Sequence, residues 1–292
     1  MNSNNVKIVK DYPARGPLHQ YRLGESTAFR CFRCGDSKKS KLIALYDDNW
    51  ERLLCNGCYG RLLSIYDIKA GTTSDDEKAA ELASLLLSLL VPNQQREAER
   101  LFQLSENRAQ YLSPHSLRFV ASSEYASNAF QSGPDLEWSP VIIGLCKAVE
   151  AEVVERIIIP LSRAVAGISL DADIRDKDIW RVARFCADSM TAKPPELGSF
   201  AHFLQTAVNS ESRRATSPIF RALFQLFASW PDAGWLTEAQ GLHASIDRLT
   251  KDYRNRAAHT DSLTQSDYNA CRELVIGPNG ILWRIILATK PR

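Results

Sequence analysis

The sequence predicts a mainly α-helical protein with a small β domain near its N-terminus. Three observations predict this class. Four of the seven cysteines stand in two C-x2-C pairs before residue 60. A leucine-rich amphipathic segment follows, and from residue 136 onward apolar residues recur at the helical spacing of three and four. With 292 residues, of which 45% are apolar and 24% charged, the chain is long enough to bury real cores.

The first part, residues 1–70, is interpreted as a zinc-ribbon domain. Its motifs "CFRC" and "CNGC" supply Cys31, Cys34, Cys55 and Cys58, with twenty residues between the inner pair. This spacing is typical of a tetrahedral structural Zn²⁺ site, in which each knuckle offers two thiolates. Between the pairs, "KLIALYDDNWERLLC" predicts two strands joined by a turn around residues 47–49. The other cysteines fall on expected helix faces as small buried residues.

The predicted ribbon is also the most basic part of the chain. Residues 1–70 hold twelve Lys and Arg against seven Asp and Glu, whereas the net charge of the whole chain is only +2. Aromatic residues alternate with these cations, a composition that suits a phosphate backbone and exposed bases. The same aromatic residues would also fill the core of a small domain. The sequence leaves open whether the ribbon contacts nucleic acid or protein.

Residues 71–133 are expected to form an acidic helical connector. Ser74 is a plausible N-cap with acidic residues in the first turn, and the leucines of 82–90 follow one helix face until Pro92. A second helix should cover "QQREAERLFQLSENRAQYL". The looser stretch "SSEYASNAFQSGPD" marks the expected boundary before the last domain.

Residues 134–292 are expected to form a helical domain. Its first helix should begin with Ser139 as the cap and Pro140 in the first turn, and run to Pro160. Further helices are expected at about 173–190, 196–208, 216–230, 236–259 and 265–276, the last capped by Thr264. The sequence contains neither a P-loop nor a dinucleotide-binding glycine motif.

The stretch "DYRNRAAHT" at the end of one predicted helix holds the strongest candidate for a catalytic site. The apolar seam of this helix passes through Tyr253. At about 100° per residue, Asn255 and His259 lie about 200° and 240° from Tyr253, on a shared face away from the core. Arg254 flanks that face. We therefore expect these three side chains to face solvent, a cleft or a partner subunit.

An Arg and a His can together support RNA cleavage. A base must take the proton of the ribose 2′-OH, an acid must protonate the departing 5′-oxygen, and a cation must stabilise the phosphate charge. Histidine titrates near neutral pH, and arginine binds phosphate in a bidentate way. One Arg–His pair supplies only one histidine for the two proton transfers, but a two-fold dimer would supply two pairs.

"RNRAAH" resembles the R-x4-6-H motif of the HEPN superfamily of higher-eukaryote and prokaryote nucleotide-binding domains. The resemblance covers roughly 134–292 and implies a helical homodimer that joins two motifs into a metal-independent endoribonuclease site. Products would carry a 2′,3′-cyclic phosphate. Arg254 would hold the phosphate, His259 would transfer protons, and Asn255 would position substrate or His259. Lys147 and Glu150 are weaker candidates to line the same cleft.

The resemblance also suggests partners and a setting. In prokaryotes such domains occur in toxin–antitoxin, abortive-infection and CRISPR-associated systems, so a defence role with an antitoxin or activator protein is expected. The alternative is a non-catalytic regulator or adaptor, in which the ribbon binds nucleic acid and the helical domain dimerises or binds nucleotide. We expect a cytoplasmic protein, because the sequence has no membrane-spanning apolar run and no signal-peptide pattern.

Other residues are weaker candidates. Arg108 and His115 repeat the motif spacing, but Ser113-Pro114 should break the helix between them. His202 and His243 are interpreted as histidines that face the apolar core of the helical domain. The tryptophans of the last domain, Trp180 among them, are interpreted as core anchors or an interface.

Overall fold

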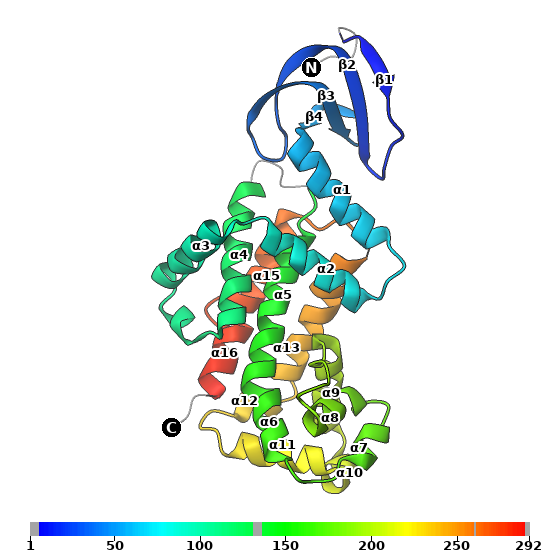
Figure 1. The fold of residues 1–292 in the computed structure, drawn as a ribbon. Coiled ribbons are helices and arrows are strands. Elements are labelled where there is room, and N and C mark those ends of the chain that lie inside the picture. The colour runs from blue at the N-terminus through cyan, green and yellow to red at the C-terminus, as the bar shows by residue number, and fades with distance from the viewer. Residues whose placement is uncertain (1–5, 131–135, 260, 290–292) are drawn as a thin grey trace.

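The computed structural model describes residues 6–130, 136–259 and 261–289, and it confirms a mainly helical protein with a small N-terminal sheet. The sheet is antiparallel, and its strands lie in the order of the chain (Figure 1). They are β1 (Ile8–Asp11), β2 (Leu18–Arg30), β3 (Ser37–Tyr46) and β4 (Asn49–Leu54). Asp47 and Asp48, both with positive φ, form the β3–β4 turn that the sequence predicted.

Helix α1 (Asn56–Ala70) begins directly after β4 and leads from the sheet to the helical body (Figure 1). Its buried face is small. Leu62 packs with Leu18 and Leu54 of the sheet, and Leu136 closes the same cluster from the segment before α5. The sheet and α1 therefore share a small core that includes Cys31 and Cys58 and that Leu136 covers from the helical part of the chain.

The upper part of the helical body surrounds α5 (Ser139–Val153), which is buried along almost its whole length. The helices packed around it are α2 (Asp75–Ser88), α4 (Pro114–Phe130), α15 (Gln265–Ile276) and α16 (Ile281–Ala288), with α3 (Pro92–Ser105) and η2 (Asn107–Tyr111) outside α4. Gly144 allows the closest approach, because a Cβ at this position would clash with Ser123 of α4 and Leu86 of α2. The helices of 71–133 thus contribute to the same core as the later ones.

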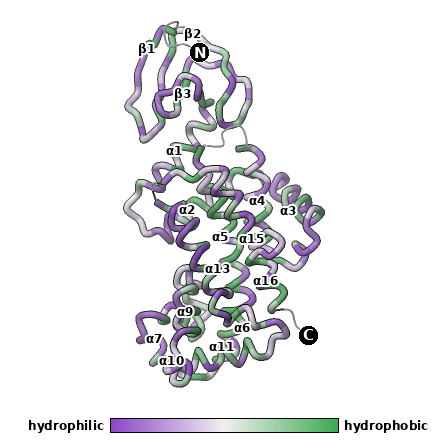
Figure 2. The backbone as a smooth tube through the Cα atoms, turned by 180° about the vertical axis from the view of Figure 1, so that it is seen from behind, coloured by the Kyte–Doolittle hydropathy of each residue, from purple (hydrophilic) through white to green (hydrophobic). Residues whose placement is uncertain are grey.

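The lower part (Figure 1) contains η3 (Val154–Ile158), α6 (Ile159–Ala164), α7 (Asp171–Arg175), α8 (Trp180–Ala187), α9 (Leu197–Asn209), α10 (Glu211–Thr216), α11 (Pro218–Ala228) and α12 (Gly234–Thr237). From there α13 (Leu242–Leu249), η4 (Thr250–Asn255) and α14 (Arg256–Ala258) lead back to the upper part, where η4 and α14 pack against α5 and α14 also packs against α2. Both η3 and η4 are π-helical. Figure 2 shows the hydrophilic character of α7 and α10 in the lower part and the hydrophobic character of α16.

Several sequence expectations for the helices need correction. The looser stretch that begins at Ser122 is helical as far as Phe130, the end of α4, and the helix expected at 236–259 begins at Leu242, as α13. The helix expected at 173–190 is two helices, α7 and α8, with a break at 176–179. Ser139 does not cap α5; instead the buried Glu137 carboxylate accepts the N–H of Ser139 at 3.0 Å. The helix expected to stop at Pro160 continues through η3 into α6. By contrast, Ser74 caps α2 in a capping box with Glu77, as predicted.

A buried ion pair joins α1 to the helical body. Lys69, in the last turn of α1, places Nζ 2.9 Å from Oε2 of Glu137 and 3.2 Å from Oγ of Ser139. The Lys69 ammonium also donates to the backbone carbonyl of Asp261. The side chains of Lys69 and Glu137 are 1% and 0% exposed. This junction therefore links the ribbon's helix to the start of α5 and to the segment just beyond His259.

Among the described residues, no helix combines the length and hydrophobicity that crossing a bilayer requires.

Candidate functional site

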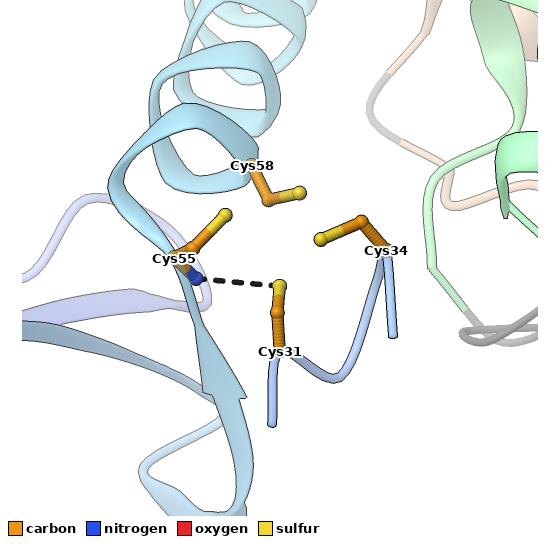
Figure 3. Close-up of side chains that lie close together, drawn as sticks. All are labelled: Cys31, Cys34, Cys55 and Cys58. Atoms are coloured by element: carbon orange, nitrogen blue, oxygen red, sulfur yellow. Dashed lines mark hydrogen bonds between the residues drawn. The ribbon is translucent and has the colours of Figure 1, made fainter. Parts of the chain in front are cut away.

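The four cysteines that the sequence singled out come together at the junction of sheet and α1. Cys31 and Cys34 lie in the β2–β3 loop, Cys55 follows β4 as the N-cap of α1, and Cys58 lies in the first turn of α1. Their sulfur atoms point toward one another (Figure 3) and all lie within 4.8 Å. A tetrahedral ion with metal–sulfur bonds of about 2.3 Å needs sulfurs about 3.8 Å apart, so a small inward movement would suffice.

The surroundings of the cluster fit a metal held by thiolates. Sγ of Cys31 accepts the backbone N–H of Cys55 at 3.3 Å (Figure 3), the kind of bond that supports a thiolate. The pKa of the Cys31 thiol is lowered, because its sulfur accepts hydrogen bonds from the thiol of Cys58 and from nearby backbone N–H groups. Arg33, between the first two cysteines, is buried and lies 4.4 Å over the Phe130 ring. Its Nε and Nη1 have no hydrogen-bond partner in the described chain, so its charge is free to offset a negative metal–thiolate group.

The Arg254–His259 stretch departs from the regular helix that the sequence suggested. The helix passes from α13 into the π-helical η4 and α14, and His259 is its C-cap. A π-helix holds more residues per turn than an α-helix, so the residues of η4 are rotated from their expected phase. As a result Arg254 is 6% exposed, as is the seam residue Tyr253. The prediction that Arg254 lies at the edge of an outward face is therefore wrong, whereas the His259 side chain is 56% exposed.

Two consecutive carboxylates of α2 contact the two ends of the motif. Asp76 forms an ion pair with Nη2 of Arg254, and Oδ2 of Asp75 lies 3.3 Å from Nε2 of His259. Nη1 of Arg254 also donates to Oδ1 of Asn255 at 3.0 Å. Burial lowers the pKa of Arg254, and the charge of Asp75 opposes this shift. Arg254 remains charged, because its guanidinium titrates far above neutral pH.

A cavity of about 450 Å³ opens beside this stretch, and we call it the Arg254 cavity. Its lining includes Arg254 and Asn255 but not His259, which lies just outside it beside Asp75. Thr250 also lines the cavity, and its buried hydroxyl has no hydrogen-bond partner among the described residues. A buried hydroxyl without a partner is costly, so this position favours a bound polar ligand or water.

The cavity also holds residues that sequence reasoning missed. Lys177, Arg181, Ser199 and His202 line it from α8, α9 and the segment before α8. His202 is not a core histidine: its side chain is 53% exposed, and Nε2 lies 3.3 Å from Oδ1 of Asp178. Helical phase could have revealed this, because His202 lies about 200° around α9 from the buried Phe200.

Lys147 and Glu150 do not line the Arg254 cavity. Nζ of Lys147 lies 2.6 Å from Oε1 of Glu150, and the other oxygen of Glu150 accepts the N–H of Leu197 at 3.3 Å. Leu197 is the first residue of α9, so Glu150 caps that helix from a distance. The pair therefore has a clear structural role.

Comparisons with protein-family models, with curated proteins and with solved structures found no significant match to this chain.

Proposed function

We propose that this protein is a metal-independent endoribonuclease of the HEPN type. It would cleave RNA by 2′-OH attack and leave 2′,3′-cyclic phosphate ends, in the cytoplasm of a prokaryote and in a defence or toxin–antitoxin setting. One observation carries the proposal. Arg254 and Asn255 line a cavity with further cations, and the same helical stretch ends in an exposed His259 beside a carboxylate.

Each residue of the motif has a role that its contacts support. Arg254 binds the scissile phosphate and offsets its growing negative charge, once a phosphate oxygen replaces the carboxylate of Asp76. Asn255 holds the guanidinium in place through its side-chain oxygen. His259 takes the proton from the 2′-OH, and Asp75 stabilises the imidazolium that results. O2′ then bonds to phosphorus as the bond to the 5′-oxygen breaks.

A second copy of the chain would complete the site. The departing 5′-oxygen needs a proton, and an exposed His259 of a second copy could donate it. In this scheme the four cysteines hold a structural Zn²⁺ that fixes the ribbon and takes no part in the chemistry. An antitoxin or activator protein would control the enzyme.

The test is cleavage of cellular RNA by the purified protein, with identification of the fragment ends. His259→Ala should abolish cleavage and leave the mass of the assembly and its zinc content unchanged. His115→Ala is the matched control, because His115 is another exposed histidine and completes the discounted second match. EDTA added to the folded protein should not stop cleavage. Equal activity in wild type and His259→Ala would refute the assigned site.

A non-catalytic role is the second candidate, and the state of Arg254 favours it. The guanidinium is 6% exposed and already paired with Asp76, as expected of a structural arginine. A regulator or adaptor of this kind would bind nucleic acid or nucleotide without producing cyclic phosphate ends. The same RNA experiment separates the two functions.

A further inference from the structure

A second hollow adjoins the Arg254 cavity. It measures about 430 Å³, and its lining runs from α8 through residues 191–196 to the start of α9. Trp180 and Arg181 line both hollows, so the two meet across the first turn of α8. We call the combined feature the α8 groove. Each hollow has the volume of a small-ligand site, about 300–1,000 Å³.

An indole ring stands where the two hollows meet. Trp180 is 38% exposed, although large aromatic side chains are normally well buried, so of the two expectations, a core anchor or an interface, it does not fit the first. The Arg181 guanidinium lies 5.5 Å from the centre of the indole ring. Nη1 of Arg181 donates to Oγ of Ser199 at 2.9 Å and to Glu196 at 3.1 Å. These bonds fix Arg181 beside the ring and leave part of the ring open to solvent.

Three exposed cations lie around the ring. Lys177 lines the Arg254 cavity, and Arg184 and Lys193 line the second hollow. All three are exposed, and none forms an ion pair with another residue of 6–130, 136–259 or 261–289. The hollows are also lined by carboxylates, including Asp178 and Asp188. Arg184 and Lys193 interact with the charges of Asp188 and Glu77 but form no close ion pair with them, whereas Arg254 must first exchange Asp76. An anion that spans both hollows would therefore meet Lys177 first.

We propose that the α8 groove binds single-stranded RNA, with one base stacked on Trp180 and the flanking phosphates held by Lys177 on one side and by Arg184 and Lys193 on the other. This inference rests on the proposed function and adds the substrate class. An exposed aromatic ring between cations is the arrangement that single strands require, because every unpaired base has a face that can stack. A duplex hides those faces, so the groove discriminates against it.

Binding can be measured separately from cleavage. A fluorescein-labelled polyuridine oligonucleotide with 2′-O-methyl groups lacks the attacking hydroxyl, and fluorescence anisotropy reports its affinity for the full chain. Trp180→Ala should weaken binding on the order of tenfold, and Trp180→Phe should restore most of it. Tyr125→Ala is the control for loss of an exposed aromatic residue on α4. A duplex of the same length should bind more weakly than the single strand.

The salt dependence of binding tests the cations. In the double variant Arg184→Gln/Lys193→Gln, the slope of log K against log salt should fall by about 1.4, or about 0.7 for each lost phosphate contact. Arg221→Gln, which removes an exposed arginine on α11, should leave the slope unchanged.

The outcomes separate this inference from the proposed function. If Trp180→Ala binds the oligonucleotide as tightly as the wild type does, the proposal that the α8 groove binds single-stranded RNA is refuted, even where the wild type cleaves RNA. If binding depends on Trp180, the proposal is supported, even where no cleavage occurs. A change in the mass of the assembly of Trp180→Ala, without a change in oligonucleotide affinity, would assign the ring to a protein interface and also overturn the proposal.

Discussion

The buried pair between Lys69 and Glu137 allows a quantitative prediction about the joint between ribbon and helical body. Both side chains are almost fully enclosed, at 1% and 0% exposure, and their charged atoms lie 2.9 Å apart. Lys69→Met would leave the Glu137 carboxylate buried without its cation. Removing one partner of a buried ion pair typically lowers the free energy of unfolding by about 3–5 kcal/mol. The loss of the hydrogen bonds to Ser139 and to the carbonyl of Asp261 adds to this cost.

The assay is urea unfolding followed by circular dichroism, carried out as a double-mutant cycle. Glu137→Gln alone should also destabilise the protein, because it leaves Lys69 without a carboxylate. The double variant Lys69→Met/Glu137→Gln removes both charges of the pair and should lose less than the sum of the single variants, by about 2–3 kcal/mol. Lys251→Met is the control, since its pair with Asp247 is exposed and should change stability by less than about 1 kcal/mol.

Equal losses for Lys69→Met and Lys251→Met would refute the reasoning, because burial would then add nothing to the pair. Strict additivity in the cycle would refute it as well. A large loss with strong coupling would confirm that Lys69 couples α1 to the start of α5.

Three further predictions concern the metal, the core and pH. Cys58→Ser, or a strong chelator applied during unfolding, should lower the melting temperature and unfold the sheet, as followed by zinc release and circular dichroism. Gly144→Ala should lower the free energy of unfolding by about 1–3 kcal/mol, because its Cβ would clash with α2 and α4, whereas Gly60→Ala, with open space around it, should not destabilise the protein. Burial lowers the pKa of His19, but bonds from both ring nitrogens to carboxylates outweigh it, and the pKa is raised above 6.5. The contacts of His19 therefore stabilise the folded protein fully below pH 6.5, and this stabilisation is lost as the pH rises through the higher pKa that His19 has in the folded state. Asp48→Asn should make the free energy of unfolding, measured at several pH values, fall less steeply over this range.

Features set by neighbouring residues could be predicted from the sequence. The cysteine pairs, the turn at Asp47 and Asp48, and the capping box at Ser74 all depend on local spacing, and the structure contains each of them. The helix expected at 265–276 is Gln265–Ile276, with Thr264 as its cap. Local signals work here because caps and turns satisfy backbone groups within a few residues.

Features that depend on distant neighbours could not be predicted. The acids at the start of α2 are adequately explained by the helix dipole, and nothing in the sequence indicates that Asp76 meets Arg254, 178 positions later. The π-helical turn of η4 has no residue signature either, so the assumption of about 100° per residue gave Arg254 the wrong phase. Helix α16 was missed, because "ILWRIILA" is short and apolar apart from Arg284, and such a run cannot be told from a buried strand by its pattern alone.

The contacts of α2 bear on how the motif at the end of η4 can work. Ser74 and Glu77 already cap α2, so the carboxylates of Asp75 and Asp76 are not needed to satisfy its N-terminus. They lie instead against Arg254 and His259, the two ends of the motif. A carboxylate beside His259 can hold the imidazole ring in place for proton transfer, whereas a carboxylate on Arg254 competes with phosphate. The same turn of α2 therefore favours one half of the proposed chemistry and opposes the other. If the proposed function holds, RNA binding must draw on cations that α2 does not neutralise, and within the described chain these include Lys177 and Arg184 of the α8 groove.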